Sequence, residues 1–168
     1  MKPIILNKPE MKVVGYAIRT STVEQRSLRE IPIFWQRYIE EKMWETIPNK
    51  LNDRVEMGVS IDCDCEGGDF TYLIGFETDA ELDLTDSELI CRTLPAATYA
   101  VFTTPPVPEE KFSDTIQATW KEIFQNWFPD SGYEHAGAPE IELYDERTQN
   151  REAKQMDIYI PIQPRMNG

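Results

Sequence analysis

The chain has 168 residues, a length that suits one domain of ordinary size with room for a buried core. It carries 17 basic and 30 acidic residues, giving a net charge of −13 that disfavours nucleic-acid binding, because phosphates require basic partners. Its N-terminus has no signal-peptide pattern, and no segment is apolar over the length that spans a bilayer, so we expect a cytoplasmic globular protein.

Alternation of apolar and polar residues predicts six strands. In chain order they are Met11–Thr20, Arg54–Cys63, Asp69–Thr78, Thr98–Thr104, Pro139–Glu146 and Gln155–Ile162. Gly67 and Gly68 predict a hairpin turn between the second and third of them. Several short strands of this kind favour a sheet with one face on a core.

Two segments instead have apolar residues at helical spacing. The first stripe is Ile31, Phe34, Trp35, Tyr38, Ile39 and Met43; the second is Phe112, Ile116, Trp120, Ile123, Phe124 and Trp127. Pro32 suits the first turn of the first helix, and Pro129 is expected to end the second helix. The order strand, helix, strand, strand therefore occurs twice.

The two halves also share a weak sequence repeat. Gly15–Thr20 matches Thr98–Thr103 at an offset of 83 residues, and Tyr72–Phe76 matches Ile158–Ile162 at an offset of 86. We expect an α+β fold built from a duplicated βαββ module, with an antiparallel sheet and two amphipathic helices on one face. A pseudo-twofold would relate the halves, and a ligand groove would lie on the other face.

The domain prediction is a single domain over residues 1–168. Its repeat halves are residues 9–79 and 95–163. The acidic stretch Asp79–Glu88 is expected to connect them. Within this alignment, Gly58 stands opposite Glu142, so the halves are not equivalent in function.

Strand alternation also selects candidate site residues. In the fifth strand Ile141 and Leu143 point one way, whereas Glu142 and Tyr144 point the other way, and Tyr159 is expected to share that second face. Aromatic rings beside a carboxylate suit an organic cation, although alternating Glu and aliphatic residues also occur on ordinary solvated strands.

Motifs for catalysis and metal binding are weak. The single histidine, His135, is expected in a loop, and Cys63 and Cys65 lack a second Cys/His pair that would complete a zinc site. With Cys91 they are expected to be reduced thiols, while a redox or metal role of Cys63 and Cys65 stays open. No catalytic residue, metal site or cofactor is predicted.

Several motifs resemble the gyrase-inhibitor-like effector-binding superfamily, in particular its stand-alone, integron-associated members. They are Pro95–Phe102, Trp120–Pro129, Ser131–Tyr133, Pro139–Tyr144 and Met156–Ile162, with looser matches at Ile31–Trp35 and Tyr72–Glu77. The resemblance implies a duplicated βαββ fold and a pocket glutamate that pairs with cationic aromatic ligands. It carries that role to Glu142, places Tyr144 and Tyr159 in the pocket wall, and adds Trp120. Many relatives also carry a DNA-binding helix-turn-helix, and none is expected here.

Three functions follow as hypotheses. The first is a stand-alone binding protein for amphipathic or cationic aromatic small molecules, without direct contact to nucleic acid or membrane. The second is an acidic module that binds a protein partner, and the third is a hydrolase with a pocket carboxylate. The natural ligand and the oligomeric state are not predicted.

Overall fold

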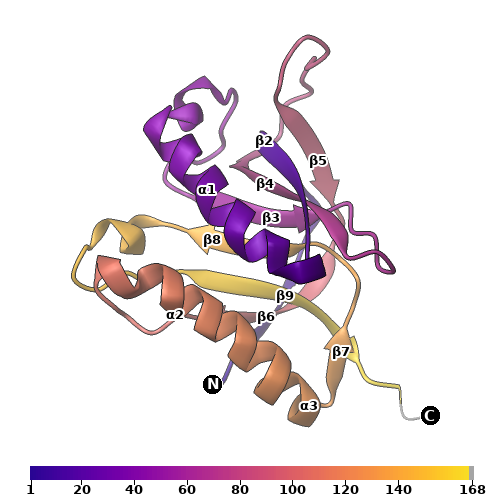
Figure 1. The fold of residues 1–168 in the computed structure, drawn as a ribbon. Coiled ribbons are helices and arrows are strands. Elements are labelled where there is room, and N and C mark those ends of the chain that lie inside the picture. Colours follow the sequence, from indigo (N-terminus) through magenta and orange to yellow (C-terminus); the bar gives the residue numbers. More distant parts are fainter. Residues whose placement is uncertain (167–168) are drawn as a thin grey trace. The chain divides into compact units, whose positions relative to one another are not determined.

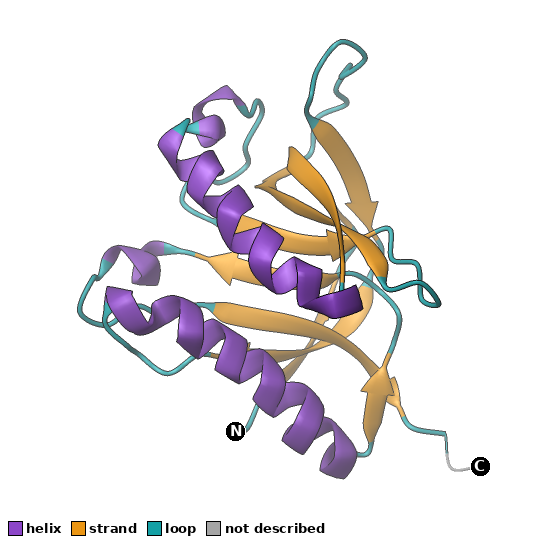
Figure 2. Cartoon of the chain, viewed as in Figure 1, coloured by secondary structure: helices purple, strands orange, loops and turns teal. Residues whose placement is uncertain are grey.

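The computed structural model describes residues 1–166, and the chain divides into two compact units. The first unit is Glu10–Leu94, and the second unit combines Met1–Pro9 with the chain from Pro95 onward. Each unit has an antiparallel sheet with a long helix packed on one face (Figure 1; Figure 2). The predicted α+β class is confirmed.

The first unit contains one long helix and four strands. They are β2 (Met11–Ser21), α1 (Arg26–Glu40), β3 (Glu56–Ile61), β4 (Asp69–Thr78) and β5 (Ile90–Leu94), with short 3₁₀ turns at Val23–Gln25 and Met43–Thr46. The strands lie in the order β3-β4-β2-β5. The core between sheet and helix contains Val14, Tyr72, Ile74 and Phe76 on the strands and Phe34 and Tyr38 on α1.

The second unit repeats this arrangement. Its elements are β1 (Ile4–Lys8), β6 (Ala97–Thr103), α2 (Glu109–Glu122), a π-helical turn (Ile123–Trp127), α3 (Phe128–Ser131), β7 (Tyr133–His135), β8 (Glu140–Tyr144), a 3₁₀ turn (Glu146–Gln149) and β9 (Asp157–Pro164). The main strands lie in the order β1-β6-β9-β8, and β7 pairs with the end of β9. The core contains Ala100, Phe102, Ile158, Ile160 and Ile162 against Ile123 and Phe128.

The two strand orders confirm the duplication. In each unit the strand before the long helix lies beside the last strand of the hairpin, as β2 beside β4 and β6 beside β9. An edge strand completes each sheet: β5 pairs with β2, and β1 pairs with β6. Sequence alternation missed β1, β5 and β7, which have three to five residues and are too short to show a clear period.

Both helices depart from their predicted ends. The expected first-turn position of Pro32 is wrong, because α1 begins at Arg26 and Pro32 lies inside it. Proline leaves the carbonyl of Leu28 without its helical donor, and Leu28 is 50% exposed, so water can reach this stretch. The expected helix end at Pro129 is also wrong, because a π-helical turn leads into α3 and Pro129 lies in the first turn of that segment. Gly132, with φ 75°, ends α3.

Cross-strand pairing corrects the offset of 83 residues. Tyr16 pairs with Ile74 on the helix-facing side of its sheet, whereas Tyr99 pairs with Pro161, between the helix-facing Ile160 and Ile162. Side chains alternate along a strand, so an odd offset aligns opposite faces. An offset of 84 aligns Tyr16 with Ala100, which pairs with Ile160. The repeat is therefore genuine, but the two tyrosines are not equivalent.

Within residues 1–166, none of the helices is sufficiently long and apolar to cross a membrane.

Candidate functional site

Glu142 lies on β8 and faces helix α2. It pairs with Ile158, a residue of the helix-facing core, and directly paired residues of an antiparallel sheet point to the same side. Its side chain is buried, with 8% of the residue exposed. The predicted position on the face opposite the helices is therefore wrong. Alternation separated the two faces of β8 correctly, but only the pairing with β9 shows which face meets the helix.

Trp120 holds this carboxylate from the helix. Its indole Nε1 donates a hydrogen bond to Glu142 Oε2 across 3.1 Å. One turn further along, the ring of Phe124 stacks on the indole, with the ring centroids 6.1 Å apart and the planes 11° apart. The helical spacing of Phe112, Ile116 and Trp120 turns all three toward the sheet. Local helix geometry thus places an aromatic donor on a buried carboxylate.

Tyr144 lies on the same side of β8 as Glu142, two residues further on, and packs against the helix-facing core. The structure therefore brings together three of the four predicted site residues, namely Trp120, Glu142 and Tyr144. This group combines one acidic group with aromatic rings inside the second unit. We call it the Glu142 site.

Tyr159 is separated from this group by the sheet. It pairs with Val101 and Ile141 and points away from α2. Its ring lies against Tyr99, with centroids 5.9 Å apart, and Lys8 Nζ lies 5.2 Å from its centroid. Burial raises the pKa of the Tyr159 hydroxyl, and Asp157 adds to the effect. The prediction that Tyr159 shares a face with Glu142 is wrong.

A histidine–carboxylate pair, formed by His135 of β7 and Glu140 of β8, lies on the helix side of the sheet. His135 Nε2 and Glu140 Oε1 are 2.9 Å apart, and the ring of Phe124 stacks near the imidazole at 6.4 Å. Because His135 Nδ1 accepts a hydrogen bond from the Gly137 amide, Nε2 carries the proton in the neutral ring and donates to Glu140. The sequence predicted a loop at His135, whereas it lies on β7, so this pair was missed. The shared alternation of Glu140 and Glu142 was its one signal.

The first unit also holds a carboxylate beside its helix. Tyr38, which is completely buried, donates from its hydroxyl to Glu56 Oε2 across 2.6 Å. Burial raises the pKa of Glu56, while the Tyr38 hydrogen bond and the charge of Lys50 oppose that shift. The pKa of Tyr38 is raised well above its ordinary value by burial and by the neighbouring carboxylate. Sequence reasoning predicted this strand from alternation but did not single out Glu56 as a site residue.

Strand register also revises the predicted counterpart of Glu142. At the offset of 86 residues, Ile158 corresponds to Tyr72, and Tyr72 pairs with Ser60. Ser60 rather than Gly58 therefore stands at the position of Glu142. The predicted asymmetry between the halves holds at this position, although Glu56 supplies a carboxylate elsewhere on the strand.

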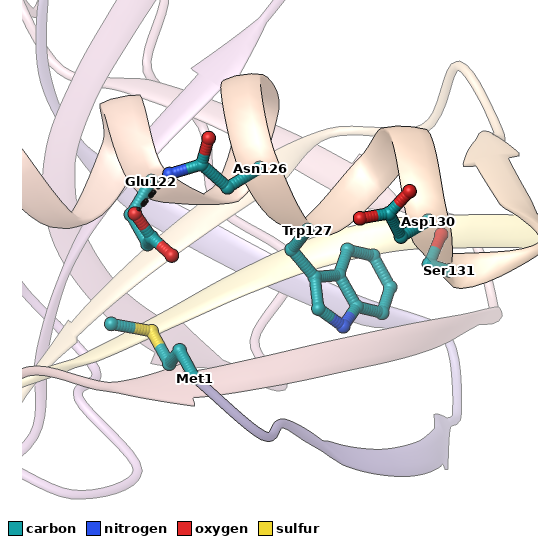
Figure 3. Close-up of a pocket in the computed structure, with 6 residues that line it drawn as sticks. All are labelled: Met1, Glu122, Asn126, Trp127, Asp130 and Ser131. Carbon is teal, nitrogen blue, oxygen red and sulfur yellow. Dashed lines mark hydrogen bonds between the residues drawn. The ribbon is translucent and has the colours of Figure 1, made fainter.

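A separate shallow hollow lies beside the last turns of the helical segment. It has a volume of about 230 Å³ and is lined by Met1, Glu122, Asn126, Trp127, Asp130 and Ser131 (Figure 3). Two of these side chains are carboxylates on the helix, and the indole of Trp127 lies between them. None of the Glu142-site residues lines it.

Metal coordination finds no support within residues 1–166, where no three His, Cys, Asp or Glu side chains form a group that could hold an ion. Cys63 and Cys65 are exposed in the hairpin turn, and Cys91 is half-buried on β5.

Comparisons with solved structures show the same fold. The protein SAV2435, solved bound to tetraphenylphosphonium, is 19% identical with a TM-score of 0.77, covering 97% of this chain and 94% of its own. A putative bacterial transcription regulation protein from Staphylococcus aureus MU50 is 19% identical with a TM-score of 0.71, covering 97% and 99%. An integron cassette protein from the mobile metagenome of Vibrio cholerae is 16% identical with a TM-score of 0.66, covering 97% of each chain.

The sequence comparisons identify the family. No curated protein sequence gives a significant match. A family model described as integron-associated effector binding protein matches residues 4–162, nearly the whole chain. The resemblance to gyrase-inhibitor-like effector-binding proteins is thereby confirmed, and the chain belongs to the family of integron-associated effector binding proteins.

Proposed function

We propose that the second unit binds an amphipathic organic cation at the Glu142 site. The observation that carries the proposal is the buried carboxylate of Glu142, 8% exposed, held by the indole N–H of Trp120. A carboxylate removed from water gains from a nearby opposite charge, because the surrounding medium screens weakly. A cation whose charge is spread over aromatic groups loses little hydration on entering such a site.

The aromatic rings give the proposed site its preference for flat or bulky aromatic ligands. Trp120, which donates to Glu142, and Tyr144, two residues further along the same face of β8, offer ring faces and apolar edges to a ligand. Ring faces attract cations electrostatically and also bury apolar surface, so the two effects act on the same ligand. Glu142 serves as the counter-charge, Trp120 both orients it and contacts the ligand, and Tyr144 contributes wall surface.

The related protein SAV2435 supports this class of ligand. It was solved with tetraphenylphosphonium, a cation with four phenyl groups, and shares the fold at 19% identity. That ligand is therefore the first probe for this chain. Its size-matched anion, tetraphenylborate, has the same four phenyl groups and the opposite charge, and so separates the charge of the ligand from its shape.

Calorimetric titration tests the proposal. The parent protein should bind tetraphenylphosphonium and discriminate against tetraphenylborate, and Glu142→Gln should weaken cation binding at least about tenfold, or about 1.4 kcal/mol. Glu146→Gln is the matched control, since it removes the same charge from an exposed residue four positions away and should change affinity less than about twofold. Equal binding by Glu142→Gln and the parent would reject Glu142 as the counter-charge.

A further inference from the structure

Strand β2 is paired on both sides along only the first part of its length. Strand β5 pairs with β2 only from Met11 to Gly15, whereas the pairing of β2 with β4 continues to Ser21. Beyond Gly15, the outer edge of β2 is thus left without a neighbouring strand among the described pairings. Ala17 and Ile18 are partly exposed and Arg19 is exposed, so this edge is accessible.

The backbone groups along this edge point outward at Ala17 and Arg19. The carbonyl of Arg19 accepts a bond from the exposed Arg26 side chain, and the amide of Thr22 instead donates inward to Gly68, next to β4. Because these directions alternate along a strand, Ala17 and Arg19 share the outward direction. An unpaired row of this kind can accept an added strand. The Arg26 contact is long, at 3.4 Å, and can be exchanged for a peptide amide.

A groove runs beside this edge, under helix α1. Its volume is about 480 Å³, and it is lined by Ile18, Arg19, Glu30, Ile33, Phe34 and Arg37. Ile33 is 65% exposed although it lies on the central part of the helix. Apolar side chains on the helix side of the groove suit the alternate side chains of an extended peptide.

The groove is lined by two arginines, Arg19 and Arg37, although the chain has a net charge of −13. Arg19 donates to the carbonyl of Asp62 and the hydroxyl of Thr71, neither of which is a carboxylate. Among residues 1–166, the ion pair of Arg37 is a long, exposed contact of 3.4 Å to Glu41. Glu30, the one acidic residue of the lining, is paired with Arg26 and accepts from Thr20. Two guanidinium groups therefore remain to attract carboxylates.

We propose that this groove binds an extended acidic peptide segment of a partner protein, which adds as a strand to the outer edge of β2. Its main chain pairs with Ala17 and Arg19, apolar side chains on one face enter the groove beside Ile18 and Ile33, and acidic side chains on the other face meet Arg19. Arg37 in the groove lining adds positive charge that attracts the acidic segment. The site is distinct from the Glu142 site and lies wholly in the first unit.

A fluorescein-labelled hexapeptide of alternating Val and Glu is the probe, and its anisotropy gives the affinity. We expect saturable binding, which the matching Val/Lys hexapeptide does not show. Arg37→Glu should weaken binding at least about fivefold, because it reverses a charge in the lining. Arg29→Glu is the matched control on the same helix; Arg29 contacts the carbonyl of Glu24 outside the groove, and this variant should stay within about twofold.

Methylated peptides test the strand addition itself. In antiparallel addition the residues opposite Ala17 and Arg19 point away from α1, so methylation of the Glu amides blocks binding and methylation of the Val amides does not. In parallel addition the two sets exchange roles. No saturable binding below about 1 mM, equal binding of the Val/Lys peptide, or equal binding of both methylated peptides would overturn the proposal. Tetraphenylphosphonium titration of the same samples reports separately on the Glu142 site.

Discussion

The hydroxyl of Tyr38 donates a 2.6 Å hydrogen bond to Glu56 in the first unit, and the indole of Trp120 donates a 3.1 Å bond to Glu142 in the second. In both units the donor is an aromatic residue of the long helix. The acceptor is a carboxylate on the strand beside the hairpin's last strand, namely β3 beside β4 and β8 beside β9. The strand positions differ. Ser60 is the register equivalent of Glu142, and Glu56 lies four residues before Ser60. The same kind of contact was therefore built at two different places in one repeated frame.

The pH dependence of stability should identify Glu56. Burial raises its pKa above the ordinary value of 4.5, so the folded chain holds this proton more tightly than the unfolded chain. The free energy of unfolding contributed by this group should consequently fall as pH rises from about 4.5 through the folded-state pKa, and stay level above it. Glu56→Gln removes this loss, so its stability relative to the parent should improve from pH 4.5 to pH 7.

Urea unfolding at a series of pH values measures this difference. Glu77→Gln is the control, because Glu77 is an exposed carboxylate on the adjacent strand β4. Its difference from the parent should vary little with pH over the same range. A Glu56→Gln profile parallel to the parent profile would show that Glu56 has no raised pKa in the folded chain.

Glycine pairing at the centre of the first sheet predicts a steric effect. Gly15 and Gly75 lie directly opposite each other, and a Cβ added to Gly75 would come within 2.0 Å of the Val14 carbonyl oxygen. The Val14 backbone is held in the sheet and cannot shift without strain. Gly75→Ala should therefore lower the free energy of unfolding by at least about 2 kcal/mol. Gly67→Ala is the control, since its nearest atom belongs to the flexible side chain of Asp64. Thermal unfolding that ranks the two variants equally would contradict the close approach.

The hydrogen-bonding role of Trp120 can be separated from its ring. Trp120→Phe keeps an aromatic ring but removes the donor to Glu142 Oε2, so tetraphenylphosphonium affinity should fall about three- to tenfold. Trp127→Phe is the matched control on the same helical segment, where the ring stacks on Tyr133 with planes 10° apart. Calorimetry suits both variants because it does not depend on tryptophan fluorescence. An unchanged affinity in Trp120→Phe would show that the indole N–H does not orient the bound state.

Sequence patterns predicted the elements of this chain better than their mutual placement. Alternation along β8 correctly grouped Glu142 and Tyr144 on one face. It placed that face opposite the helices, because Ile141 and Leu143 are the more apolar pair. The actual choice depends on register: Glu142 pairs with Ile158, and a shift of one residue would reverse it.

Register is set by contacts between strands that are distant in sequence, so a single-strand pattern cannot supply it. The same limit explains the wrong equivalence of Tyr16 and Tyr99, which match as letters but lie on opposite faces. It also explains why Glu56 and the His135–Glu140 pair escaped notice. Helical spacing placed Trp120 on the core-facing stripe correctly, because that spacing depends only on neighbours along the chain, and the family resemblance named it as a site residue.

The two tyrosines predicted for the ligand wall should behave differently. Tyr144 lies on the helix side with Glu142, whereas Tyr159 lies on the other side of the sheet beside Tyr99 and Lys8. Tyr144→Leu should therefore weaken tetraphenylphosphonium binding about three- to tenfold, since it removes a ring face from the site. Tyr159→Leu should leave affinity within about twofold and lower stability instead, because it opens a packed aromatic contact. Calorimetric titration and thermal unfolding of both variants decide the matter: a larger affinity loss in Tyr159→Leu would move the site to the other face of β9.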